Sequence, residues 1–499
     1  MSAPKAPALR GPPPRGGGET LGAARRLFLM NAAGQSEIIR LGAAELSQAF
    51  ARRELSPVEV TQAVISQIER CEPHLNALYA YDPEAALAQA RASEARWLAG
   101  TALSPLDGVP GTLKENIATR GCPMPVGTAA TDLAPLLDDA PPAARWNEAG
   151  LVLLAKTTMP DYGMLSSGLS SFHKLARNPW DTRKNPGGSS AGAGAAAAAG
   201  YGPLHVGTDI GGSVRLPAAW CGLVGLKPSG GRIPIKPPYA GRVAGPMTRT
   251  VRDAAWLMSV LSQPDWRDAT SLPPCNTPWL QLGRDIKGLK LGLLMDAGWG
   301  LPVEPETQAA VLAAAHALAA AGATIEPLAP FCTRTMADGM DRFWRMRSYL
   351  DMQALPEARR QKVLPYIREW VATGASLTAA DVFTGYSQIA ALRDATVAAC
   401  QPYDFVLSPT SPVPSYAAEW ASPTNDPARP FEHIAFTLPY NMSEQPALSI
   451  NCGFTAGGLP IGLQIVGHRH DDLGVLQVAA AYEQLRGAMP DWPMGLGAG

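Results

Sequence analysis

The sequence carries little charge and lacks the residue patterns that hold metal ions. Charged residues make up 17% of the 499 residues, and the formal net charge is −1. A nucleic-acid-binding or anionic-membrane surface requires a basic excess, so we expect neither partner. The seven cysteines form no Cys-x-x-Cys pair, and the seven histidines are dispersed. We therefore expect no metal or other cofactor, and reduced thiols in a cytoplasmic protein.

Long apolar runs are also missing. No window of about 18 residues is apolar enough to cross a bilayer, which predicts a protein without a membrane anchor. Residues 1–34 are rich in Pro, Gly and Arg and show no periodicity, so we expect a disordered N-terminal extension. The hydrophobic fraction of 46% is sufficient for a substantial core. No internal repeat or composition break divides the rest, which predicts one large domain over residues 35–490.

Secondary-structure signals favour an α/β protein. Ser56-Pro57-Val58-Glu59 is a capping box with proline at the first helical position. Residues 290–294, 304–318 and 323–327 alternate as strand, helix and strand, which predicts parallel strands. Residues 447–452 and 459–466 are typical of a hairpin-like pair of strands. Residues 331–400 are helical and aromatic, and we expect part of this segment to line a substrate pocket.

The stretch from Asn185 to Pro228 contains two Gly-Gly-Ser loops, which end at Ser189 and Ser213, 24 residues apart. Glycine lets backbone N–H groups approach a ligand closely. A serine beside such glycines can attack a carbonyl next to a nest of anion-stabilising donors. The pattern predicts a serine-nucleophile enzyme. We expect the alanine-rich segment between the loops to form a closely packed helix.

Lys114 follows a Gly-Val-Pro-Gly turn and is flanked by Leu113 and Ile117. This apolar setting predicts burial, which disfavours the charged ammonium and lowers the pKa. A lysine with a lowered pKa can act as a general base near neutral pH.

Three short motifs compete with this interpretation, and each lacks its required context. Residues 188–192 match Gly-x-Ser-x-Gly, but no strand precedes them as a hydrolase nucleophile elbow requires. Residues 192–197 match a loose dinucleotide fingerprint, again without a preceding strand. Residues 171–174 match the Ser-x-x-Lys of penicillin-binding proteins, but no Lys-Thr-Gly follows. We set all three aside.

The combination of Lys114, Ser189 and Ser213 resembles the amidase signature enzymes. The resemblance extends over about residues 38–485 and is most specific in the serine-rich centre. Its motifs are Gly108-Val109-Pro110 before Lys114, Asn178-Pro179-Trp180-Asp181, Pro186-Gly187-Gly188-Ser189-Ser190, Gly207-Thr208-Asp209-Ile210-Gly211-Gly212-Ser213-Val214-Arg215, Gly225-Leu226-Lys227-Pro228 and Gly458-Leu459-Pro460-Ile461-Gly462.

The resemblance implies a Ser-cisSer-Lys triad. Ser213 would be the nucleophile, Ser189 the bridging serine after a cis peptide bond from Gly188, and Lys114 the base. The N–H groups of Ile210, Gly211 and Gly212, with that of Ser213, would form the oxyanion hole. It also implies a single domain with a mixed, twisted central β-sheet flanked by helices on both faces.

The sequence departs from the family pattern at two positions beside the triad. Glu115 stands where the family usually has Asp, and Ala191 replaces a glycine after the paired serines. Because the three reacting groups are present, we expect a free-standing amidase that acts on a small-molecule amide. The alternative is the glutamine-hydrolysing subunit of a tRNA-dependent amidotransferase, and a third interpretation is a non-catalytic binding protein. The sequence is also compatible with a homodimer.

Overall fold

The computed structural model describes residues 32–496, and one eleven-stranded sheet runs through it. The predicted extension 1–34 lies outside the described residues except at its end, where helix α2 (Ala32–Ile38) begins. The strands are β1 (Leu78–Tyr79), β2 (Pro110–Lys114), β3 (Val152–Thr157), β4 (Leu204–Asp209), β5 (Val224–Lys227), β6 (Val243–Thr248), β7 (Lys290–Leu293), β8 (Thr324–Pro327), β9 (Phe405–Pro409), β10 (Ala447–Phe454) and β11 (Pro460–Val466).

The sheet is mixed, and its order is β1-β3-β2-β4-β6-β5-β10-β11-β9-β7-β8. β2 pairs in parallel with both β3 and β4, and β7 pairs in parallel with β8 and β9. The central strands from β4 through β6, β5, β10 and β11 to β9 are antiparallel. The α/β class with a mixed central sheet is therefore confirmed.

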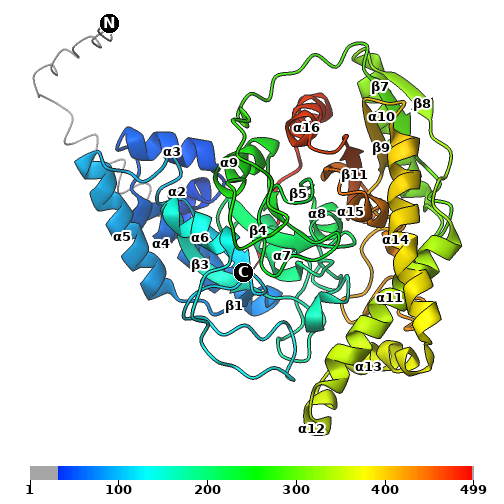
Figure 1. The fold of residues 1–499 in the computed structure, drawn as a ribbon. Coiled ribbons are helices and arrows are strands. Elements are labelled where there is room, and N and C mark those ends of the chain that lie inside the picture. The colour runs from blue at the N-terminus through cyan, green and yellow to red at the C-terminus, as the bar shows by residue number, and fades with distance from the viewer. Residues whose placement is uncertain (1–31, 497–499) are drawn as a thin grey trace, which may run out of the picture.

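Helices cover both faces of the sheet (Figure 1). α7 (Ala191–Ala198) and α8 (Arg215–Cys221) pack on one face, and α9 (Val251–Leu261), α10 (Pro305–Ala320) and α16 (Asp472–Arg486) pack on the other. The remaining helices are α3 (Ala43–Ala51), α4 (Pro57–Leu75), α5 (Pro83–Ala99), α6 (Pro141–Glu148), α11 (Arg334–Gln353), α12 (Glu357–Arg360), α13 (Pro365–Ala372), α14 (Ala379–Cys400) and α15 (Leu438–Met442), with short 3-10 turns at Asp161–Gly163, Thr373–Ser376 and Glu432–Ile434.

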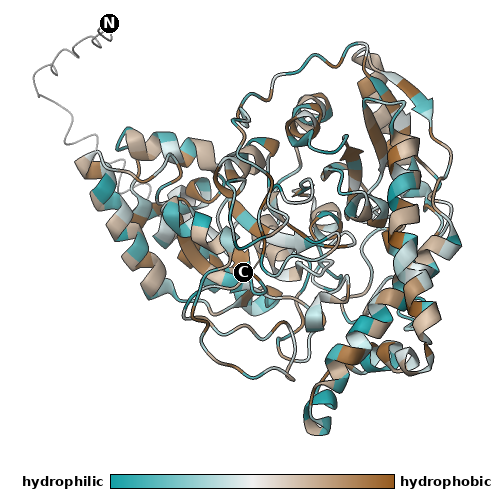
Figure 2. Ribbon diagram, viewed as in Figure 1, coloured by the Kyte–Doolittle hydropathy of each residue, from teal (hydrophilic) through white to brown (hydrophobic). Residues whose placement is uncertain are grey.

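The local sequence signals are confirmed where they are strong. Ser56 caps α4 by accepting the Glu59 N–H, and the Glu59 side chain accepts the Ser56 N–H. The strand–helix–strand unit forms as β7, α10 and β8, and the hairpin forms as β10 and β11. Figure 2 shows apolar residues concentrated on the inner strands, whereas α5 and α12 carry bands of hydrophilic residues. Burial of these apolar strand residues therefore stabilises the domain.

Helix α7 packs closely against the sheet because its side chains are very small. Its sequence consists only of alanine and glycine, and every residue is fully buried. A Cβ atom on Gly192 would lie 2.1 Å from the Ala77 carbonyl oxygen, closer than any real contact. The predicted closely packed helix is therefore present, and its small residues allow the backbone to approach β2, β3 and β4.

Candidate active site

Lys114, Ser189 and Ser213 lie at one edge of the sheet. Lys114 is the last residue of β2, and Ser213 lies in the loop between β4 and α8. Because β2 and β4 are parallel neighbours, their carboxyl ends meet at this edge. Ser189 precedes α7, which packs against both strands. The Ser190 N–H donates to Ser213 O at 3.2 Å, so the backbone of the Ser213 loop lies beside the paired serines.

Lys114 contacts the paired serines directly. Its Nζ atom is 2.7 Å from Ser189 Oγ and 3.1 Å from Ser190 Oγ. The Gly188–Ser189 peptide bond is cis, as the resemblance implied. Ser190 Oγ also accepts the Thr208 N–H at 3.2 Å, which ties this loop to β4. Sequence reasoning missed Ser190 as a second partner of Lys114.

Burial lowers the pKa of the Lys114 amine. The side chain is fully buried, and desolvation, followed by the positive charge of Arg242, lowers its pKa well below the usual value. Asp209 and Glu115 oppose this shift only in part. The amine is therefore available as a proton acceptor at lower pH than a surface lysine.

A lowered pKa does not by itself identify the base. Burial also lowers the pKa of Lys156 and of Lys227 to about 7. Lys156 donates to Ile117 O and Thr119 Oγ1, and Lys227 donates to Pro228 O. Only Lys114 among these three donates to a serine hydroxyl, so geometry distinguishes it.

Ser213 is held beside backbone donors. The residue is 9% exposed, and its hydroxyl makes no hydrogen bond with any residue from 32 to 496. The backbone N–H groups of Ile210, Gly211 and Ser213 are likewise unpaired within that range. The Gly212 N–H, by contrast, donates to Asp209 Oδ1 at 2.8 Å. Of the four predicted oxyanion donors, three are therefore open and Gly212 is already engaged.

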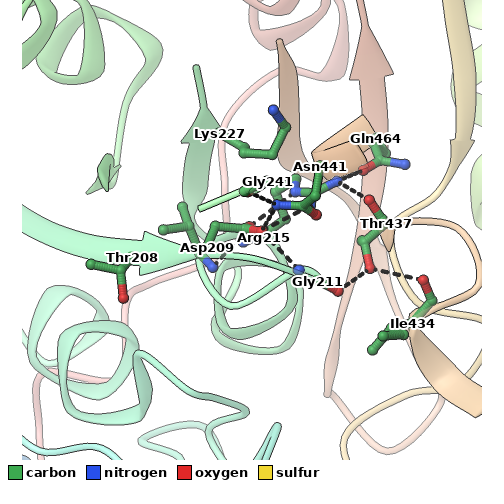
Figure 3. Close-up of polar contacts among 12 residues, drawn as sticks. Thr208, Asp209, Gly211, Arg215, Lys227, Gly241, Ile434, Thr437, Asn441 and Gln464 are labelled. Atoms are coloured by element: carbon green, nitrogen blue, oxygen red, sulfur yellow. Dashed lines mark hydrogen bonds and ion pairs between the residues drawn. The ribbon is translucent and has the colours of Figure 1, made fainter. Parts of the chain in front are cut away.

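A buried polar network fixes this loop (Figure 3). Arg215 pairs with both carboxylate oxygens of Asp209, at 2.9 and 3.0 Å, and both side chains are fully buried. Burial would raise the pKa of the Asp209 carboxyl, but the charge and hydrogen bonds of Arg215 outweigh it and lower the pKa. The remaining Arg215 donors reach Thr437 O, Gln464 Oε1 and Asn441 Oδ1. The network holds the loop from Asp209 to Arg215 in one conformation.

Two apolar side chains lie next to Gly211 in the same loop. A Cβ atom on Gly211 would lie 3.3 Å from Ile434 Cδ1 and 3.5 Å from Trp344 Cη2. Trp344 belongs to α11 and packs edge-on against Phe431. Ile210 packs against the same apolar cluster. Trp344 of the segment 331–400 and Ile434 of the 3-10 turn Glu432–Ile434 thus form an apolar wall beside the candidate oxyanion loop.

The two departures from the family pattern have distinct surroundings. The Glu115 carboxylate is fully buried and accepts from His173 Nε2 at 2.7 Å, so its extra length reaches a loop histidine. No sequence signal singled out His173. Ala191 is the first residue of α7 and is fully buried.

Neither a membrane-spanning helix nor a metal cluster is found in the part of the chain that the structure describes. No helix over residues 32–496 is long and apolar enough to cross a bilayer. Over the same residues, no group of three or more His, Cys, Asp or Glu side chains is arranged to hold a metal ion.

Comparisons with known proteins agree with the fold and the motifs. A family model described as Amidase matches residues 59–476. The chain is 34% identical to a glutamyl-tRNA(Gln) amidotransferase subunit from Chloroflexus aggregans, over 89% of this chain and 95% of that protein. It is 33% identical to an acylamidase of Rhodococcus erythropolis, over 89% of this chain and 95% of that protein. The structure of a bacterial aryl acylamidase of the amidase signature family superposes with a TM-score of 0.83 at 29% identity, covering 89% of this chain and 96% of that chain.

The chain therefore belongs to the amidase family, in the amidase signature class. It is an amide hydrolase by family.

Proposed function

We propose that the protein is a free-standing amidase that converts a small carboxylic amide to the carboxylate and ammonia or an amine. The proposal rests chiefly on the contact between the buried Lys114 amine and Ser189 Oγ, at 2.7 Å. A cytoplasmic location belongs to the same proposal and stays a prediction.

The chemistry proceeds as a proton relay. Neutral Lys114 takes the Ser189 proton while Ser189 takes the proton of Ser213, and Ser213 Oγ forms a bond to the amide carbonyl carbon. The carbonyl oxygen becomes an oxyanion, for which the unpaired N–H groups of Ile210, Gly211 and Ser213 are suitable donors. The relay then returns the proton to the leaving nitrogen as the C–N bond breaks.

Deacylation reverses the same steps with water. A water molecule attacks the ester on Ser213 and gives up a proton through Ser189 to Lys114. The Ser213–acyl bond then breaks, and the proton returns to Ser213. Arginine could not take the place of Lys114, because its guanidinium does not deprotonate at accessible pH.

The alternative is the glutamine-hydrolysing subunit of a tRNA-dependent amidotransferase, which the likeness to the Chloroflexus protein favours. The apolar wall at Trp344 and Ile434 favours the free-standing enzyme, because an apolar wall suits an unsubstituted acyl chain better than the charged α-ammonium group of glutamine. Ile210, at a position where that subunit typically has threonine, points the same way.

The test is release of ammonia or amine from a panel of aliphatic amides, aryl amides and glutamine, with the purified chain alone. We expect turnover of several amides in the panel. Activity on glutamine alone, and only with added partner proteins, would establish the alternative. No release from any amide would favour the binding-protein interpretation.

A further inference from the structure

Three side chains beside the candidate site carry more hydrogen-bond donors than their partners within residues 32–496 use. We call Tyr239, Arg242 and Arg347 the donor cluster. The Tyr239 hydroxyl is buried and has no partner of good hydrogen-bond geometry within the described residues. The Arg242 guanidinium donates to Pro237 O at 3.0 Å, and no carboxylate in residues 32–496 pairs with it. Among the carboxylates of the same residues, Arg347 reaches only Asp351, at 3.7 Å, and both side chains of that pair are about half exposed.

The donor cluster lies between the loop before β6 and helix α11. The Arg347 guanidinium carbon is 4.2 Å from the centroid of the Tyr239 ring. Phe343 of α11 stacks on the same ring, with centroids 6.3 Å apart and planes 12° from parallel. The Arg242 N–H donates to Tyr239 O at 2.9 Å, which closes the loop.

Both sides of the cluster connect to the candidate oxyanion loop. The Gly241 carbonyl, next to Arg242, accepts Asn441 Nδ2 at 3.0 Å, and the same amide nitrogen donates to Asp209 at 2.9 Å (Figure 3). On α11, Trp344 follows Phe343 and reaches Gly211. The charge of Arg242 also contributes to the lowered pKa of Lys114, as expected of neighbouring groups.

Within residues 32–496, the half-exposed Asp351 is the only carboxylate that pairs with either arginine, so the cluster keeps a net positive charge in the free enzyme. Burial, followed by the charge of Arg347, lowers the pKa of Arg242 to about 10. A bound anion would relieve both effects. A carboxylate fits best, because its two oxygens accept from a guanidinium fork and from a phenol at the same time.

We propose that the donor cluster binds a carboxylate at the end of the substrate remote from the scissile amide. The inference rests on the proposed function and narrows it: the substrate class is an amide that carries a free carboxylate, such as the monoamide of a dicarboxylic acid. The apolar wall of Trp344 and Ile434 would contact the chain between the two ends. Arg242 and Arg347 are then specificity determinants.

The experiment uses dicarboxylic monoamides of increasing chain length, each paired with its methyl ester. Ester and acid differ in charge but little in shape, so the ratio of their kcat/KM values isolates recognition of the carboxylate. We expect the wild-type enzyme to favour the acid by about 10- to 100-fold at the best chain length. Arg242→Gln and Arg347→Gln should bring the ratio towards one, and Tyr239→Phe should lower it less.

For Arg242→Gln, the quantity to compare is the ratio of kcat/KM for the acid to kcat/KM for its ester. This substitution also removes a charge that lowers the pKa of Lys114, so it shifts the pH profile for both substrates together. Arg342→Gln is the matched control: Arg342 lies on the same helix but its Cβ packs toward Gly385 of α14, so the ratio should stay at the wild-type value.

A charge reversal gives an independent test. Arg242→Glu should prefer an ω-amino amide, which carries a cation at the remote end, over the dicarboxylic monoamide. Equal kcat/KM for acid and ester in the wild-type enzyme would overturn the inference. So would variants that lower both values equally.

Binding separates failure of this inference from failure of the proposed function. Calorimetric titration of the Ser213→Ala variant with the acid and with its ester requires no turnover. Tighter binding of the acid, lost in Arg242→Gln, would support the carboxylate site even if no amide were hydrolysed. Equal binding of acid and ester would reject the site even if both were hydrolysed.

Discussion

The catalytic segment (residues 185–228) and the helical segment (residues 331–400) are built in opposite ways. In the catalytic segment, α7 is wholly buried and Arg215 has its charge neutralised by the fully buried Asp209. In the helical segment, Phe383 is 73% exposed and Tyr386 is 52% exposed. The first segment is fixed by buried polar contacts, several of them to residues 437–464. The second presents some of its aromatic side chains to solvent. The first carries the proposed nucleophile and bridging serine, and we expect substrate specificity to depend on the second.

Removing the nucleophile should have the largest effect. Ser213→Ala should abolish turnover, a loss of at least about 10⁴-fold in kcat, because the proposed acyl-enzyme forms on Ser213 Oγ. Amine release under single-turnover conditions measures it. Since the Ser213 hydroxyl makes no hydrogen bond within residues 32–496, the midpoint of thermal unfolding should stay unchanged. Retention of a few per cent of the wild-type rate would contradict the assignment.

Removing the base should have the next largest effect. Lys114→Ala should lower kcat by about 10³-fold or more near neutral pH. The proposed base is the neutral amine of Lys114, so in the wild-type enzyme kcat should rise with pH through its lowered pKa and level off above it. The variant should lose this acidic limb. Near-full activity of Lys114→Ala at neutral pH would refute the relay.

Breaking the buried pair tests whether the catalytic segment depends on its internal contacts. Arg215→Met leaves the Asp209 carboxylate buried without its partner, which should cost about 3–5 kcal/mol of the free energy of unfolding. Because the loop would also loosen, kcat should fall by about 10²-fold. Denaturant unfolding and steady-state kinetics measure the two effects. Glu357→Gln is the control from the helical segment, where the pair with Arg360 is exposed on the Glu357 side, and its unfolding midpoint should not change.

The smallest effect should come from changing the size of Trp344 in the apolar wall. Trp344→Phe should change the relative kcat/KM of small and bulky amides by about 10-fold, while kcat for the best substrate stays within a few-fold. A panel of acyl groups of increasing size measures the change. A uniform loss across the panel would show that Trp344 supports the loop rather than selects the acyl group.

Features that depend on local sequence could be predicted. Lys114 is flanked by apolar residues, so its burial was predictable. Ser189 and Ser213 stand in glycine-rich loops whose pattern singled them out, and the roles of all three residues stay predictions. The capping box at Ser56 and the strand–helix–strand unit follow from local periodicity, which tertiary packing did not override.

The missed features depend on contacts that are distant in sequence. Strands β2 and β6 contain Pro and Gly, and only their pairing in the sheet makes them strands. Asn441 meets Asp209 across 232 residues, and His173 meets Glu115 across 58. The engagement of Gly212 by Asp209 depends on how the loop folds back on itself. No local pattern encodes these contacts.

Helix α7 has a practical consequence for altering the enzyme. A methyl group on Gly192 would press on Ala77 O, and α7 follows Ser189 and Ser190 directly, so any added volume would displace the two serines that meet Lys114. Only exchanges that add no volume fit in this helix. Mutant libraries aimed at new substrates should therefore leave residues 191–198 untouched and concentrate diversity on helix α11 and the loop before β6. Gly241 should be kept, because its carbonyl accepts from Asn441 in the buried network.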